Sequence, residues 1–130
     1  MSARRGGSKD RILAAAIEAF AEHGSFGVRM DDVGARASVN KAMVYYYFSS
    51  REELYESVVR CVIGDMYSRI QDGLRQTSDD DPVVLLTRFV HLHFDVYSEN
   101  DTYPRIVIDC LNNEPELIKR AFDEALSDSG

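Results

Sequence analysis

The stretch SVNKAMVYYYF occupies residues 38–48 and decides how the chain around it can fold. It predicts a short helix, because the side-chain oxygen of Asn40 can accept a backbone N–H of the first turn and no Gly or Pro follows within the next two turns. A helix this short is unstable by itself and must be held by neighbouring helices. The residue spacing divides it into an inward set, Val39, Val44 and Phe48, and a mostly outward set, Lys41, Ala42, Met43, Tyr45 and Tyr46.

A first supporting helix is expected from residue 8 or 9 to residue 23. Its apolar residues recur every three or four positions, which is the period of an amphipathic helix, and Gly24 ends it. One face of this helix should therefore support the two helices that follow. The apolar positions are Ile12, Leu13, Ala16, Ile17, Phe20 and Ala21.

A second helix is expected from about residue 30 to residue 37, followed by a short turn. Asp31 and Asp32 are favourable in its first turn, where the helix dipole is positive. Arg29 stands where a capping hydroxyl is usual, so a cap is lost and a cation is gained. Gly34 lowers the stability of this helix by up to about 1 kcal/mol.

The order of these elements, with four short sequences, resembles the N-terminal helix-turn-helix of the TetR family of transcriptional regulators. The sequences are RILAAA (11–16), AFAEHG (19–24), MDDVGARASV (30–39) and YYYFSSREEL (45–54). The resemblance implies an all-α fold in which the second helix of the pair enters the major groove of DNA. The chain departs from the family pattern at Ser25, Arg29, Gly34 and Met43, which bears on operator choice more than on fold.

The same resemblance assigns roles to the outward side chains. Lys41 is expected to contact guanine O6 or N7, and Ala42 and Met43 to contact a thymine methyl. Phosphate contacts fix the register on DNA, whereas base contacts select the sequence. An alternative for the tyrosines is a packed aromatic surface cluster. The expected DNA-binding set is Arg29, Asn40, Lys41, Ala42, Met43, Tyr45, Tyr46, Tyr47 and Arg51, with Tyr45, Tyr47 and Arg51 on phosphates and Tyr46 on a base or sugar.

Charge divides the chain into two parts. The net charge is −7, but residues 1–50 carry seven Lys or Arg against five Asp or Glu, so residues 51–130 carry −9. A basic head on an acidic body can bind phosphate, because charges are screened beyond about 10 Å at 0.1 M salt. No apolar run approaches the length of a membrane span, and no signal peptide is apparent, so we expect no membrane association and a cytoplasmic location.

A long connecting helix is expected after residue 50. Ser50 and Glu53 form a capping box at its start. Its apolar residues are spaced by four, so the stripe turns about 40° around the helix at each step. The start can then pack on the head and the end on the body. The stripe is Leu54, Val58, Val62, Met66, Ile70 and Leu74, flanked by Tyr55, Val59, Ile63 and Tyr67.

Three further helices complete the expected fold. Asp81 caps the first, which Pro82 begins, and Pro104 begins the second after a polar loop at 98–103. The expected ranges are 82 to about 97, 104 to about 113, and 116–126. The apolar face of the first is Leu86, Phe89, Val90, His93, Val96 and Tyr97, and that of the last is Leu117, Ile118, Ala121, Phe122 and Ala125.

Enzymatic chemistry is not indicated, and we expect no cofactor. The sequence has no nucleophile motif, phosphate loop or acid/base pair. His91 and His93 are two positions apart and diverge on a helix, which argues against a metal site. Cys61 and Cys110 lack any CxxC or Cys/His cluster and are interpreted as buried, reduced thiols.

The resemblance also implies partners: a palindromic double-stranded DNA operator, an unknown small-molecule effector and a second copy of the chain. The expected domains are a flexible arm at 1–8, a DNA-binding domain at 9–50 and a partial regulatory domain at 51–130, with the dimerising helices absent after Gly130. Ordinary core packing is the alternative for the candidate effector contacts. These candidates are Met66, Phe89, His93, Tyr97 and Tyr103.

A different class of function remains open at this stage. An unfinished helical bundle would expose apolar surface at Leu117, Ile118 and Phe122, and could serve as a protein-interaction module. Salt-dependent binding to random duplex DNA distinguishes the two classes, since only the regulator requires it.

Overall fold

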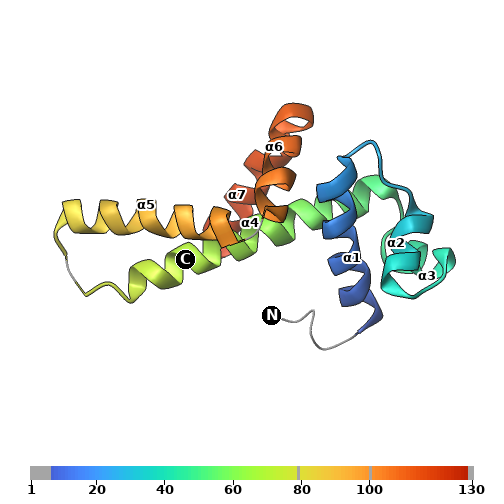
Figure 1. The fold of residues 1–130 in the computed structure, drawn as a ribbon, viewed down its shortest axis with the longest axis horizontal. Helices are drawn as coiled ribbons and strands as arrows, with labels where there is room; N and C mark the ends of the chain where they lie inside the picture. The colour runs from blue at the N-terminus through green and yellow to red at the C-terminus, as the bar shows by residue number, and fades with distance from the viewer. Residues whose placement is uncertain (1–6, 79, 100, 129–130) are drawn as a thin grey trace.

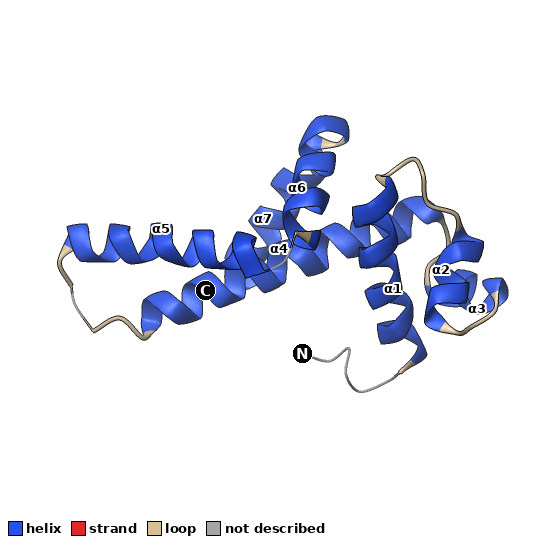
Figure 2. Cartoon of the chain, in the orientation of Figure 1, coloured by secondary structure: helices blue, strands red, loops and turns tan. Residues whose placement is uncertain are grey.

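The computed structural model describes residues 7–78, 80–99 and 101–128, and within these ranges every regular element is an α-helix (Figures 1 and 2). The expected all-α class is therefore confirmed. Residues 1–6 of the expected arm, and Asp79, which precedes the expected cap Asp81 by two positions, lie outside the described residues. The helices are α1 (Ser8–His23), α2 (Met30–Ala37), α3 (Lys41–Tyr47), α4 (Arg51–Arg75), α5 (Pro82–Glu99), α6 (Thr102–Asn113) and α7 (Pro115–Asp128).

Helices α1, α2 and α3 form the head, which lies at one end of the molecule (Figure 1). Its core is closed by side chains that are fully or almost fully buried, and the first turns of α4 add Leu54 to it. Gly24 ends α1 with a φ of 76°, a conformation that glycine adopts without strain. The shared core consists of Ile12, Phe20, Val33, Val44, Phe48 and Leu54.

The structure explains why position 34 holds a glycine, which helix propensity alone does not explain. A Cβ at this position would lie 2.9 Å from the Val39 carbonyl oxygen and 3.4 Å from Cγ2 of Val44. The missing side chain therefore lets α2 approach the turn and α3 closely. The expected weakening of α2 is offset by this packing.

Helix α4 joins the head to the remaining helices, which form the body. It packs on α1 of the head and on α5, α6 and α7, and it already meets α6 at Tyr55, near its start (Figure 1). Ser50 caps it as expected, with its hydroxyl accepting the Glu53 N–H at 3.1 Å. The Glu53 carboxylate accepts the Ser49 N–H at 2.8 Å, one residue before the donor of a standard capping box. The expected stripe is buried up to Ile70, and Leu74 is half-buried.

Two expectations about the body need correction. Helix α5 buries Leu92 and Val96, while Leu86 and Val90 of its predicted inner face are 63% and 55% exposed. Leu92 can be buried against α4 because Gly73 leaves room for it. A Cβ at Gly73 would overlap the Leu92 side chain. Helix α6 begins at Thr102, before Pro104, because proline fits any position of a first turn that lacks an N–H partner.

Helix α7 packs its apolar face on α4 and does not expose it. Leu117, Ile118 and Ala121 are buried, and only Phe122 of the predicted face is substantially exposed, at 40%. The protein-interaction surface expected at Leu117 and Ile118 is therefore wrong. No helix of the described residues combines the length and apolar character needed to cross a lipid bilayer.

Candidate nucleic-acid interface and effector groove

Helix α3 presents its outward residues on a firmly placed surface. The Asn40 side chain accepts the Met43 N–H at 2.8 Å, and Val44 beneath is completely buried. Above this base, Met43, Tyr45 and Tyr46 are 36%, 42% and 79% exposed. Exposed large side chains on a helix that its neighbours already hold are available for a partner.

The three tyrosines occupy different environments. Tyr46 and Tyr47 meet edge to face, with ring centroids 5.0 Å apart, and Tyr47 is half-buried against the core. Tyr47 thus supports Tyr46 from below, a geometry that aromatic pairs favour. Tyr45 and Tyr46 stay exposed, while the contact between Tyr46 and Tyr47 also fits the alternative of an aromatic surface cluster.

Lys41 begins α3 in an ion pair with Asp31 of α2, with 3.2 Å between Nζ and Oδ1. Both side chains are more than half exposed, so the pair contributes little to stability. A DNA phosphate or base would have to compete with the Asp31 carboxylate for this ammonium group. Arg29 is exposed at the N-cap of α2 and its side chain makes no capping bond there.

Arg51, an expected phosphate contact, makes a contact within the chain in this structure. Its guanidinium donates to the carbonyl oxygen of Ser25 in the α1–α2 loop and lies 3.6 Å from Glu52. The side chain is only 29% exposed. In this arrangement Arg51 fastens the α1–α2 loop to α4.

Asp109 of α6 is an important residue that the sequence did not single out. Its carboxylate accepts the Ser25 N–H at 3.1 Å, the Tyr55 hydroxyl at 2.8 Å and the Asn113 amide at 3.1 Å. Burial raises the pKa of Tyr55 well above its ordinary value, and the hydrogen bond to Asp109 adds to this, so the phenol remains a donor. Since 84 positions separate Asp109 from Ser25, no local pattern predicts the contact.

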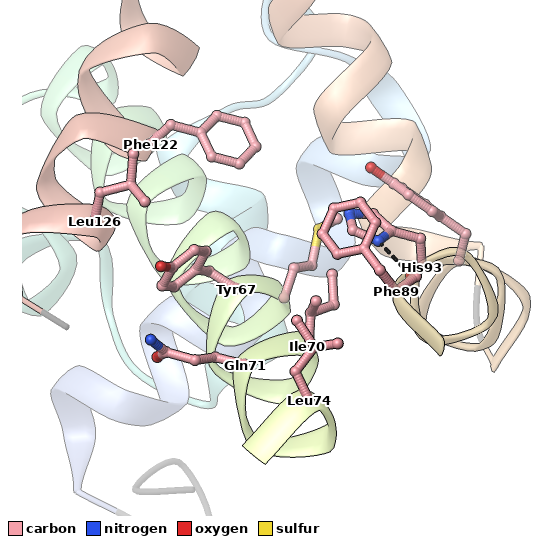
Figure 3. Close-up of a pocket in the computed structure, with 10 residues that line it drawn as sticks. Tyr67, Ile70, Gln71, Leu74, Phe89, His93, Phe122 and Leu126 are labelled. Carbon is pink, nitrogen blue, oxygen red and sulfur yellow. Dashed lines mark hydrogen bonds between the residues drawn. The ribbon is translucent and has the colours of Figure 1, made fainter. Parts of the chain in front are cut away.

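The effector candidates gather in a groove of about 390 Å³ between α4, α5 and α7 (Figure 3). Four of the five, Met66, Phe89, His93 and Tyr97, line it. In the figure, Phe89 and His93 of α5 face Ile70 of α4 across the space. The lining residues that sequence reasoning missed are Tyr67, Ile70, Gln71, Leu74, Phe122 and Leu126.

Tyr103 is the candidate that does not line the groove. Its hydroxyl donates to Asp65 at 2.7 Å, and burial raises its pKa above the usual value. His93 has a defined local contact, since its Nδ1 lies 2.9 Å from the Phe89 carbonyl oxygen. The groove therefore offers apolar and aromatic walls with few polar groups, the usual character of a small-molecule site.

Metal-ligating residues do not cluster in the part of the chain that the structure describes. Both cysteines are free thiols; Cys110 is buried, and Cys61 is only half-buried. Burial raises the pKa of each thiol, which keeps them protonated and unreactive.

Comparison with known proteins agrees with this geometry. Residues 12–58 match the family model described as bacterial regulatory proteins, tetR family. The biofilm operon icaADBC negative transcriptional regulator IcaR of Staphylococcus aureus (strain Newman) is 30% identical over 109 residues, which cover 83% of this chain and 55% of the relative. The transcriptional activator FasR of Mycolicibacterium smegmatis is 35% identical over 72 residues, which cover 55% of this chain and 33% of the relative.

A solved structure gives the same fold. The crystal structure of SCO4942 from Streptomyces coelicolor superposes with a TM-score of 0.71 at 28% identity, covering 85% of this chain and 57% of that one. The chain spans about half the length of the staphylococcal relative and a third of that of the mycobacterial one. The similarity includes both the head and most of the body, so it is not confined to a single motif.

Proposed function

This chain belongs to the TetR family of transcriptional regulators, and from that premise we propose that it is a sequence-specific DNA-binding repressor. The observation that carries the proposal is the surface of α3, where Met43, Tyr45 and Tyr46 are exposed on a capped helix held from below by α1 and α2. Such a helix can enter the major groove while its neighbours contact the backbone.

Within this surface, roles divide between base reading and phosphate binding. Lys41, Ala42 and Met43 begin the helix, where recognition helices contact base edges. Tyr45 and Arg29 are exposed and suit phosphate oxygens. Tyr46, which is 79% exposed, suits a base or sugar. The proposed operator is palindromic, which requires two copies of the chain with recognition helices about 34 Å apart.

The groove supports a response to a small, largely apolar effector. Met66 and Ile70 on the second half of α4 line it, whereas Leu54 at the start of α4 lies in the head core. One helix therefore contacts both the effector site and the DNA-binding head. An effector that shifts the later turns of α4 would tilt the head and lower its affinity for DNA.

The test compares two variants of the α3 surface on selected and scrambled duplex DNA. Tyr45→Ala should weaken binding to both about equally, because a phosphate contact carries no sequence information. Lys41→Ala should change the ratio of the affinities for the selected and the scrambled duplex, because a base contact is worth roughly 1–3 kcal/mol of discrimination. Lys119→Ala, at an exposed lysine of α7, is the matched control and should change neither.

Salt dependence supplies the decisive measurement. Affinity for random duplex should fall steeply as salt rises, since phosphate binding releases counterions. A chain that ignores duplex DNA even at low salt would contradict the proposed function. Equal losses on both duplexes from Lys41→Ala would contradict only the base-reading role.

A further inference from the structure

The α1–α2 loop is fastened at one residue from two sides. The Ser25 N–H donates to the Asp109 carboxylate of α6 at 3.1 Å, and the Ser25 carbonyl accepts from Arg51 of α4. Ser25 is itself buried, with 6% of its surface exposed. A loop held at both backbone polar groups of one residue can shift only by breaking one of these contacts or by moving α4 or α6 with it.

Asp109 is fixed in turn by several donors. Its Oδ2 accepts both the Ser25 N–H and the Tyr55 hydroxyl, and its Oδ1 accepts the Asn113 amide. Gly24 contributes the space, because a Cβ there would lie 3.2 Å from Oδ1. The carboxylate therefore has a defined place between α6, α4 and the loop.

The contact continues along the packed faces of α1 and α6. Ile106 and Cys110 of α6 are buried in the same core as α1, and Arg105 lies close enough to Glu22 to help lower its pKa, after the larger effect of Arg36. Helix α6 also packs on α7 and α4, both of which line the groove. It thus lies between the groove walls and the head.

We infer that Asp109 is a positioning residue that ties the DNA-binding head to α6, so that the orientation of the head follows this helix as well as α4. The inference deepens the proposed function and rests on it, because head orientation matters only to a chain that binds DNA. By reciprocity, DNA binding at the head must then change the local stability of α6.

Three variants separate this role from ordinary support of the fold. Asp109→Ala removes the carboxylate that accepts the Ser25 N–H and the Tyr55 hydroxyl. Asp109→Asn keeps one oxygen that can accept both the Ser25 N–H and the Tyr55 hydroxyl. Asp65→Ala is the matched control, because Asp65 also accepts a tyrosine hydroxyl, that of Tyr103 at 2.7 Å, yet lies within the body.

The first measurement is amide hydrogen exchange of the free full chain. Exchange of the Ser25 amide should be at least about 10-fold faster in Asp109→Ala, less affected in Asp109→Asn, and changed by less than about 2-fold in Asp65→Ala. Unchanged exchange at Ser25 in Asp109→Ala would overturn the inference, whether or not the chain binds DNA. Asp109→Ser, whose oxygen lies one bond closer to the backbone than those of the carboxylate, replaces Asp109→Ala if that variant does not fold.

The second measurement adds random duplex DNA at low salt. In the wild type and in Asp65→Ala, DNA should slow exchange in the α6 amides at 106–110. In Asp109→Ala, DNA should still bind with an affinity within about 5-fold of the wild type, while the α6 response is lost, because coupling and affinity are separate quantities. An α6 response that persists in Asp109→Ala would overturn the inference, whereas failure of the wild type to bind DNA would instead refute the proposed function.

Discussion

The head and the body expose different kinds of side chain. On α3 the exposed large residues include Tyr45 and Tyr46, whose rings end in hydroxyl groups. On α5 the most exposed ones are hydrocarbon: Val83, Leu86, Val90 and Phe94 are 71%, 63%, 55% and 70% exposed. The head thus has a closed core and a surface suited to a polar partner, whereas α5 is apolar on two sides and packs only one of them on α4. A helix of that kind is typical of a layer between two others.

The largest expected effect compares a core ring of the head with a surface ring of the body. Phe20 is 1% exposed and packs edge to face on Tyr55, whereas Phe94 is 70% exposed. Phe20→Ala should lower the free energy of unfolding by about 3–5 kcal/mol, because it leaves a cavity. Phe94→Ala should change it by no more than about 0.5 kcal/mol. Urea unfolding followed by circular dichroism measures both, and similar losses would remove the distinction between the two regions.

The next effect compares two glycines within helices, which helix propensity alone does not distinguish. A Cβ at Gly34 would press on the Val39 carbonyl, while a Cβ at Gly64 of α4 meets no atom within 4 Å. Gly34→Ala should destabilise the chain by roughly 1–3 kcal/mol through overpacking. Gly64→Ala should stabilise it by about 0.5–1 kcal/mol through helix propensity. Thermal unfolding of the pair tests this, and a gain in stability at Gly34 would refute the close packing.

A third comparison concerns two caps of similar chemistry. Asn40 accepts the Met43 N–H at 2.8 Å in the head, and Asp81 accepts the Val83 N–H at 2.9 Å at the start of α5. Asn40→Ala should lower the global free energy of unfolding by about 1 kcal/mol. Asp81→Ala should mainly speed amide exchange in the first turn of α5, which lies far from the closed core of the head. Equal global losses would show that α5 unfolds together with the head.

The smallest effect is a loss of stability at alkaline pH, which involves Tyr55 at the contact between head and body. Burial raises the pKa of Tyr55, so it stays protonated when tyrosines of the unfolded chain ionise near about pH 10. The contribution of Tyr55 to the free energy of unfolding is therefore complete below pH ~10 and is lost progressively above it. Tyr55→Phe should flatten the fall in stability between about pH 10 and 11. Tyr103→Phe, which removes a second buried phenol within the body, should do the same, and unchanged slopes in both variants would contradict this account.

Local signals in the sequence were enough to predict most of the fold. The caps Asn40 and Ser50 mark the starts of α3 and α4, and the apolar spacing gives the inner face of α4 up to Ile70. On α1 it gives Ile12, Ala16 and Phe20, whereas Leu13, Ile17 and Ala21 are only half-buried and the buried Ala15 and Ala19 were not predicted. These features depend on residues within a few positions of one another. They are therefore visible before any tertiary structure is known.

What could not be predicted depends on contacts between distant residues. The Ser25 loop meets Arg51 and Asp109 across 26 and 84 positions, so neither bond has a sequence signature. The buried face of α5 depends on Gly73, which admits Leu92. Tyr103 lies outside the groove because Asp65 holds its hydroxyl, although its type and position suited the expected site.

The composition of α3 has a practical consequence. The chain contains seven tyrosines and no tryptophan, so its ultraviolet emission comes from tyrosine alone. Three of the seven follow one another on α3, and Tyr46 there is 79% exposed. Burial of such a ring against duplex DNA would change the surroundings of the emitting phenol. The helix proposed to read DNA thus carries its own optical reporter, and occupancy can be followed in the unlabelled chain.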